Sequence, residues 1–308
     1  MNSLIILSAA LLMGYTAQRF GICLVNATRR TLKGDPRLLV AILLSGAWVW
    51  LYSILAYLYD WTLPFERYEL HPIFLMGGFI FGVGASINQG CSISTMNQLA
   101  KGQLGKMLTI GGWFLGWSIW NQLIAQGVFS PEYKKIDALS IKNTVIVSVT
   151  VLFFTLIFVM KFRPRINLMI GVLCIGLLAS LLFYLQPNWP PSRLMNDLGN
   201  AVLYEQPRPS LLRMGIVMAL LIGMWISVAI NHNAQLRWPK WYSGVRFLSA
   251  GTLMGIGAAM ALGGNDTQIL FGIPASSPGA LSALLFIFVG IVCEQLLYQT
   301  GVMFYKRH

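Results

Sequence analysis

The sequence predicts an all-α polytopic membrane protein. Of its 308 residues, 56 % are hydrophobic and only 10 % are charged, whereas an ordinary soluble domain carries about 25 % charged residues. Apolar runs recur along the whole chain, and several reach the roughly 20 residues that a helix needs to cross a bilayer. We therefore expect a single membrane domain spanning residues 1–308, with the lipid bilayer as its surroundings.

About nine apolar segments are predicted to cross the membrane. They are residues 3–27, 37–59, 71–101, 104–127, 142–161, 166–187, 210–231, 247–275 and 278–304. Lys and Arg gather in the loops 28–37, 161–165 and 232–246, which the positive-inside rule assigns to the cytoplasm. The loops 60–70, 128–141 and 188–209 are nearly neutral and are assigned to the outside. The sequence thus predicts a bacterial inner-membrane protein with a periplasmic N-terminus and a cytoplasmic C-terminus.

The net charge of +12 has two interpretations. It is the cytoplasmic excess of Lys and Arg that most inner-membrane proteins show, or it also sets up a field that favours anions near the mouths of a pore. No soluble domain combines basic and aromatic residues, so we expect no nucleic-acid partner. The cysteines have neither the spacing of a zinc site nor a CxxC motif, so we expect no metal and no cofactor.

A polar stretch interrupts the segment 71–101. Residues 82–95 hold three glycines, two side-chain amides, several hydroxyl groups and a thiol. Lipid cannot hydrogen-bond a free backbone, so irregular polar peptide at membrane depth persists only where protein or a water-filled cavity surrounds it. The stretch therefore predicts a broken helix that lines a transport path, although small-residue packing with internally bonded polar groups is the alternative.

A second interrupted segment, 247–275, repeats the glycine pattern of the first. One constant shift along the chain places Gly78, Gly82, Gly84 and Gly90 on glycines of the second segment, and Ala85 on Ala258. On the assigned topology the two segments enter from opposite sides of the membrane. We therefore expect inverted-repeat halves of approximately 1–141 and 142–308, whose broken helices meet near the bilayer midplane to form a substrate site.

The predicted path is lined by residues at and near the two breaks. A short helix that restarts near Ser92 would point its free N–H groups at the midplane and attract an anion. Cys91 at this position is either a reactive thiol or a packing residue. The expected lining residues are Arg19, Cys23, Asn88, Gln89, Gly90, Cys91, Ser92, Ser94, Gly264, Asn265, Asp266, Thr267 and Gln268.

Two carboxylates fall inside predicted spans. Glu294 lies in the last span, where it either couples transport to protons or pairs with an Arg of the basic C-terminus. Asp266 lies at the second break, and its charge would oppose anion binding, so we expect it to be paired, protonated or turned away from the path. Cys174 and Cys293 lie in apolar surroundings and are expected in the core.

Several of these residues resemble the YeeE/YedE family of bacterial membrane proteins. The resemblance is carried by the stretch from Gly14 through Gln18–Cys23 to Arg30, by the break ending in Gly90-Cys91, and by the inverted second copy. It implies sulfur transport, with thiosulfate uptake as the best-defined activity, and Cys23 and Cys91 match two of the family's path cysteines. The family often has a third, at the position held here by Gly264, so the substrate stays open. A small cytoplasmic sulfur-carrier protein is the partner that the resemblance suggests.

Three functional hypotheses follow. The first is a transporter or channel for a small sulfur-containing anion, in which Cys91 and Cys23 contact the ion. The second is a membrane sulfurtransferase that uses Cys91 as a persulfide nucleophile, although no His or Lys neighbours Cys91 in the sequence. The third is a small-solute channel whose cysteines only pack. Uptake by the purified protein in liposomes, with and without the thiols, discriminates among them.

Overall fold

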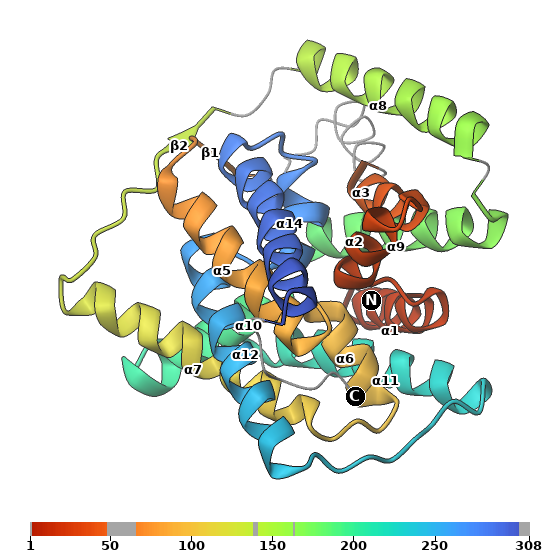
Figure 1. Ribbon diagram of the computed structural model, residues 1–308. Helices are drawn as coiled ribbons and strands as arrows, with labels where there is room; N and C mark the ends of the chain where they lie inside the picture. Colours follow the sequence, from red (N-terminus) through yellow and green to blue (C-terminus); the bar gives the residue numbers. More distant parts are fainter. Residues whose placement is uncertain (1, 48–65, 138–140, 163, 302–308) are drawn as a thin grey trace.

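The protein is an α-helical, multi-pass membrane protein (Figure 1). The computed structural model describes residues 2–47, 66–137, 141–162 and 164–301. The second half of the predicted span 37–59 and the end of the span 278–304 lie outside the described residues. The helices are α1 (Asn2–Phe20), α2 (Leu24–Leu32), α3 (Arg37–Ala47), α5 (Pro72–Asn88), α6 (Ser92–Ala100), α7 (Lys106–Ala125), α8 (Ile141–Phe162), α9 (Ile166–Leu185), α10 (Pro191–Leu203), α11 (Leu211–Ile230), α12 (Trp241–Met260), α13 (Asn265–Thr267), the π-helix η1 (Gln268–Gly272) and α14 (Pro278–Gln299).

Several helices have the length and hydropathy of a membrane span. In the described ranges, five segments pass by length and composition alone, and a sixth results when α12 and the bent α13–η1 unit are counted together. Three of these segments contain a break: α1–α2, α5–α6 and α12–η1. Large apolar side chains on their outer faces, such as Leu12, Met218 and Trp225, are exposed, as expected for a surface that meets lipid.

The first predicted span contains a break. Residues 3–27 were expected to cross the membrane, and Ser3–Leu32 has the length and hydropathy of a span, but within it α1 ends at Phe20 and α2 runs from Leu24 to Leu32. Gly21 adopts a left-handed conformation with φ 61°, which ends the helix because only glycine reaches that region without a steric penalty. Cys23 is extended and precedes α2. The break within this span is a feature that the sequence analysis did not predict.

Helices α5, α12 and α14 run side by side through the middle of the molecule (Figure 1). The contact between α5 and α12 depends on glycines, which let the two backbones touch. A Cβ atom on Gly84 would lie 2.8 Å from the carbonyl oxygen of Ala250, and one on Gly257 would lie 2.5 Å from that of Gly77. These two contacts are reciprocal, since the shift that aligns the interrupted segments carries Gly84 onto Gly257 and Gly77 onto Ala250.

The outer helices α7 and α14 pack in the same reciprocal way. A Cβ on Gly116 of α7 would lie 2.3 Å from the carbonyl oxygen of Thr252 on α12, and one on Gly290 of α14 would lie 2.3 Å from that of Phe79 on α5. Phe79 and Thr252 are equivalent under the same shift, and Gly290 is the residue after the equivalent of Gly116. Helix α7 therefore meets α12 as α14 meets α5.

A small two-stranded sheet closes one end of this helical core. Strands β1 (Arg67–Tyr68) and β2 (Lys135–Ile136) pair antiparallel, with Arg67 opposite Ile136. The hydroxyl of Tyr133, just before β2, donates to the carbonyl of Met260 at the end of α12 at 3.0 Å. Burial raises the pKa of Tyr133 to about 12, so it stays a neutral donor. The loop before β2 is thus tied to the end of α12, next to a predicted break.

We expect Gly116→Ala to destabilise the protein. The added methyl would collide with the backbone of α12, and overpacking of this kind costs about 1–3 kcal/mol. The measurement is thermal unfolding of the purified protein in detergent. Gly111→Ala on the same helix is the matched control, because no atom lies within 4 Å of its Cβ position. Equal midpoints for the two variants would contradict the packing described here.

Candidate functional site

The two predicted helix breaks have nearly the same backbone conformation. Gln89 and Leu262, at equivalent positions of the repeat, are both left-handed, with φ 60° and 57°. Two residues later, Cys91 has φ −77° and ψ −176°, and Gly264 has φ −78° and ψ −174°. A left-handed conformation is costly for a residue with a side chain, so the surrounding packing must enforce it at both places. We name them the Gln89 break and the Leu262 break.

The two breaks meet each other directly. The hydroxyl of Ser92 donates to the side-chain oxygen of Asn265 at 3.2 Å, and the backbone N–H of Ser92 donates to the same oxygen at 3.4 Å. Both residues are buried. The first residue of α6 therefore bonds to the first residue of α13.

The break between α1 and α2, which we name the Gly21 break, brings a second thiol to the same place. The thiols of Cys23, just before α2, and Cys91, just before α6, are close enough to share a hydrogen bond. The hydroxyl of Ser94 lies within hydrogen-bonding range of Cys23 as well. Both cysteines are buried and reduced. Two thiols from helix starts in different segments of the chain thus face each other.

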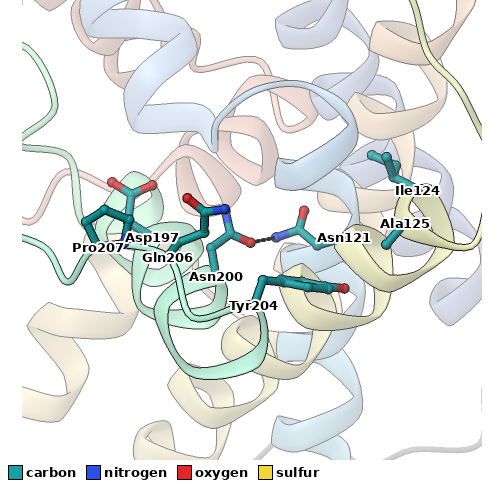
Figure 2. Close-up of a pocket in the computed structure, with 8 residues that line it drawn as sticks. All are labelled: Asn121, Ile124, Ala125, Asp197, Asn200, Tyr204, Gln206 and Pro207. Carbon is teal, nitrogen blue, oxygen red and sulfur yellow. Dashed lines mark hydrogen bonds between the residues drawn. The ribbon is translucent and has the colours of Figure 1, made fainter.

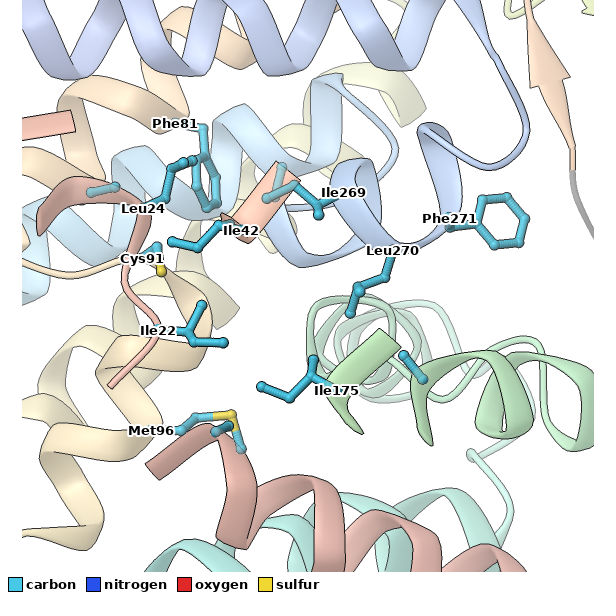
Figure 3. Close-up of a cluster of buried hydrophobic side chains, with 14 of the residues drawn as sticks. Ile22, Leu24, Ile42, Phe81, Cys91, Met96, Ile175, Ile269, Leu270 and Phe271 are labelled. Atoms are coloured by element: carbon cyan, nitrogen blue, oxygen red, sulfur yellow. The ribbon is translucent and has the colours of Figure 1, made fainter. Parts of the chain in front are cut away.

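A narrow cavity lies at this junction. Its free volume of about 20 Å³ is room for about one water molecule. Cys91, Asn265 and Asp266 line it together with apolar side chains, and Figure 3 shows the Cys91 sulfur near Ile22 and Ile42. The remaining lining residues are Ala17, Leu24, Ser45, Ile93, Ile175, Ile269 and Leu270. In this conformation the junction is closed by branched apolar side chains.

Asp266 places a carboxyl group in the wall of the cavity. It is 3 % exposed, and neither carboxylate oxygen has a hydrogen-bond partner of normal geometry among the described residues. The Ser92 hydroxyl, which lies nearby, is directed to Asn265 instead. A buried unpaired carboxylate is strongly disfavoured in its ionised form.

Lys106 supports the Gln89 break from outside the cavity. Its side chain is 1 % exposed, and Nζ donates to the backbone oxygen of Asn88 at 2.5 Å and to its side-chain oxygen at 2.9 Å. The amide of Asn88 in turn donates to the carbonyl of Gly90 at 2.8 Å and to the hydroxyl of Thr95 at 2.7 Å. Lys106 also lies over the ring of Phe247, 4.1 Å from its centroid. The network holds the backbone of residues 88–91 in place.

The Leu262 break is supported by different residues. The side-chain N–H group of Gln268 donates to the carbonyls of Ala261 and Gly263 at 2.8 and 3.1 Å. The hydroxyl of Thr267 lies 3.3 Å from that of Ser192, at the start of α10. Gln268 and Thr267 therefore stabilise the backbone of the break.

The structure does not bring every predicted residue to the cavity. Arg19 is exposed and donates to the side chain of Asn231 at 3.1 Å, so it lies away from the lining. Asn88 and Gln89 belong to the backbone support, since the Gln89 carbonyl accepts from Gln98 at 3.2 Å. Glu294 is fully buried and accepts a hydrogen bond from Ser86 on α5.

A larger pocket lies at the surface beside α7 and α10. It encloses about 560 Å³, and Figure 2 shows Asn121 of α7 facing Asn200 of α10 across it. Asn121 donates to Asn200 at 2.6 Å, and Asp197 pairs with Arg213 at 2.5 Å. None of the four cysteines lines this pocket.

The sulphur transport family matches the chain twice, over residues 19–163 and 155–293. The chain belongs to this family. It is the YeeE/YedE family that the break motifs resembled, and membership identifies the protein as a sulfur transporter. No curated protein matches the chain. The Gln89 break and the Leu262 break, and also the unpredicted Gly21 break, lie within the matched stretches of this sulphur transport protein.

Sequence reasoning missed Lys106 and the Gly21 break. A lysine at a predicted loop boundary is ordinarily a solvated or snorkelling residue, and no local pattern marks it as the partner of Asn88. The sequence does contain a pattern that could have predicted the Gly21 break. Gly21-Ile22-Cys23 has a left-handed residue two positions before a cysteine, as Gln89-Gly90-Cys91 does.

We expect Lys106→Met to loosen the Gln89 break. The side-chain oxygen of Asn88 keeps the hydrogen bond from the Thr109 hydroxyl, but its backbone oxygen loses the Lys106 donor, and an unsatisfied buried acceptor costs about 1–3 kcal/mol. Thermal unfolding should therefore start earlier, and a membrane-permeant maleimide should modify Cys91 faster, as read by mass spectrometry. Lys33→Met at an exposed lysine is the control. Unchanged modification of Cys91 in Lys106→Met would refute the supporting role.

Proposed function

We propose that this sulfur transporter carries a small sulfur-containing anion, such as thiosulfate, through the junction of the helix breaks. The observation that carries the proposal is the pairing of Cys23 and Cys91, whose thiols lie within hydrogen-bonding range at the junction. Thiol groups are weak donors with polarisable sulfur. The thiols can therefore form contacts with a desolvated sulfur-containing anion that are weak enough for the anion to leave again.

Polar groups at the junction add to these thiols. Helix α6 begins at Ser92, and the N–H groups in the first turn of this nine-residue helix point toward its start, where they favour negative charge. The Ser92 hydroxyl and the Asn265 side chain are already hydrogen-bonded to each other there. Ser92, Asn265 and Cys91 make up the anion-binding part of the proposed path.

The two halves of the chain are proposed to be inverted repeats. The reciprocal contacts of α5 with α12, and the matching contacts of α7 and α14, support a two-fold relation between the halves. The contact of Ser92 with Asn265, its counterpart in the second half, supports an axis that passes between the breaks. Two family matches, one per half, support the same division.

The proposed topology has nine crossings, with the N-terminus periplasmic and the C-terminus cytoplasmic in a bacterial inner membrane. Helix α8 is the first helix of the second half, and many of its apolar side chains are exposed. One additional crossing at α8 gives each half the opposite orientation, which is the arrangement in which paired broken helices meet at the midplane.

Transport requires the junction to open, because the cavity holds about one water molecule in this conformation. Ile22 and Leu24, which flank Cys23, belong to the apolar closure. A small shift of α2 would move these side chains and the Cys23 thiol together. We therefore propose that α2 acts as the gate and that Cys23 receives the ion when it opens.

Glu294 is the proposed site of proton coupling outside the cavity, since it is fully buried in the core and accepts from Ser86. Intramembrane carboxylates of this kind commonly carry protons. A small cytoplasmic sulfur-carrier protein is the proposed partner that would accept the transported sulfur on the inner side.

The test is uptake of radiolabelled thiosulfate by the purified protein in liposomes. We expect Cys91→Ala and Cys23→Ala each to reduce uptake by at least about tenfold, because a loss of about 1.4 kcal/mol of stabilisation changes a rate tenfold. Cys174→Ala is the control, because Cys174 lies within α9, away from the helix breaks and outside the cavity lining, so this variant should transport as the wild type does.

Two results would count against the proposal. Uptake that persists in Cys91→Ala excludes the thiol-lined path and favours a channel without thiol chemistry. Sulfur transfer to cyanide, with formation of thiocyanate and no uptake, favours the sulfurtransferase with Cys91 as its nucleophile.

A further inference from the structure

The carboxyl group of Asp266 at the junction would oppose the passage of anions if it were ionised. Asp266 lines the same cavity as Cys91, is 3 % exposed, and has no hydrogen-bond partner of normal geometry among the described residues. An ionised carboxylate there would repel the passing ion at close range. The carboxyl group must therefore serve the path in its neutral form.

The space around Gly264 shows how the carboxyl group comes to lie there. Gly264 has the backbone conformation of Cys91, but it carries no side chain. A Cβ atom at Gly264 would lie 2.8 Å from the carboxylate oxygen Oδ1 of Asp266 and 2.9 Å from the hydroxyl of Ser92. The Asp266 carboxyl therefore fills the volume into which a side chain at position 264 would project.

We infer that the protonated carboxyl group of Asp266 is the second half's counterpart of the Cys91 thiol and donates a hydrogen bond to the anion at the constriction. The inference rests on the proposed transport of a sulfur-containing anion and adds a condition to it. The ion passes only while Asp266 carries its proton. A protonated carboxyl has one O–H donor, which is what a desolvated anion requires and what an ionised carboxylate lacks.

The groups that face Asp266 leave this donor free. The elements packed against α13 include η1, which contributes Gln268 and apolar side chains, α6, whose Ser92 hydroxyl is directed to Asn265, and α10, whose Ser192 hydroxyl lies by Thr267. The Cys23 thiol lies within hydrogen-bonding range of Cys91. The basic side chains of the surrounding elements are engaged elsewhere, since Lys106 bonds to Asn88 and Arg193 lies over the ring of Phe271. No ion pair in the described part of the chain holds Asp266 in its charged form.

The experiment measures uptake of radiolabelled thiosulfate in liposomes buffered at a series of equal internal and external pH values. Wild-type uptake should fall as the pH rises, by about tenfold for each pH unit above the carboxyl's titration, because the neutral fraction falls by that factor. Asp266→Asn keeps an N–H donor and cannot ionise. Its uptake should be independent of pH and should exceed that of the wild type at alkaline pH.

Comparison of Asp266→Ala with Asp266→Asn separates the effect of the hydrogen-bond donor from that of the negative charge. It removes the repulsion and the donor together, so its uptake should be flat with pH but slower than that of Asp266→Asn. Asp137→Asn makes the same substitution at an exposed carboxylate and should retain the wild-type pH profile. A pH profile that Asp266→Asn shares with the wild type would overturn the inference, as would loss of all uptake in Asp266→Asn.

Infrared spectroscopy gives a readout that does not depend on transport. A protonated buried carboxyl contributes a C=O stretching band distinct from that of carboxylates, and this band should vanish in Asp266→Asn. If the band is absent from the wild type near neutral pH, the inference fails even where uptake is normal. If wild-type protein shows the band but takes up no thiosulfate, the proposed function fails and the inference about its path fails with it.

Discussion

Unpaired backbone groups at the helix breaks are the constraint on which this structure depends. Each break frees carbonyl and N–H groups in the middle of an apolar core, where they have no water to bond. Lys106 and Asn88 supply donors at the Gln89 break, and Gln268 supplies them at the Leu262 break. Glycine contacts between α5 and α12 bring the two supported breaks together. Because other residues provide this support, the side chains of Cys91 and Asp266 are left to line the cavity.

The sequence predicted what depends on local chemistry. Glycines and polar side chains inside long apolar runs located the breaks near Gly90 and Gly264, and the repeated glycine pattern predicted that the two interrupted segments meet. Prediction failed where the decisive partner is distant. Arg19 precedes Cys23 by about one helical turn, but its side chain turns outward to Asn231. Lys106 bonds across to Asn88, and only the packed structure reveals that pairing.

The Gly21 break illustrates a different limit. A hydrophobic run through residues 3–27 satisfies every compositional criterion of a straight span, so one glycine does not by itself predict an interruption. In the folded chain the interruption lets the Cys23 thiol reach Cys91, which lies in another segment. Tertiary contact decides between a continuous helix and a broken one wherever local preference is nearly balanced.

The meeting of Ser92 with Asn265 has a consequence for how such a path can evolve. Two identical subunits related by a two-fold axis would have to present the same residue to each other at that axis. A single chain is free of this rule, and here a serine faces an asparagine. In the inferred path, the Cys91 thiol of one half is likewise matched by the Asp266 carboxyl of the other. On the proposed path, the constriction therefore has two chemically different faces, one from each half of the chain.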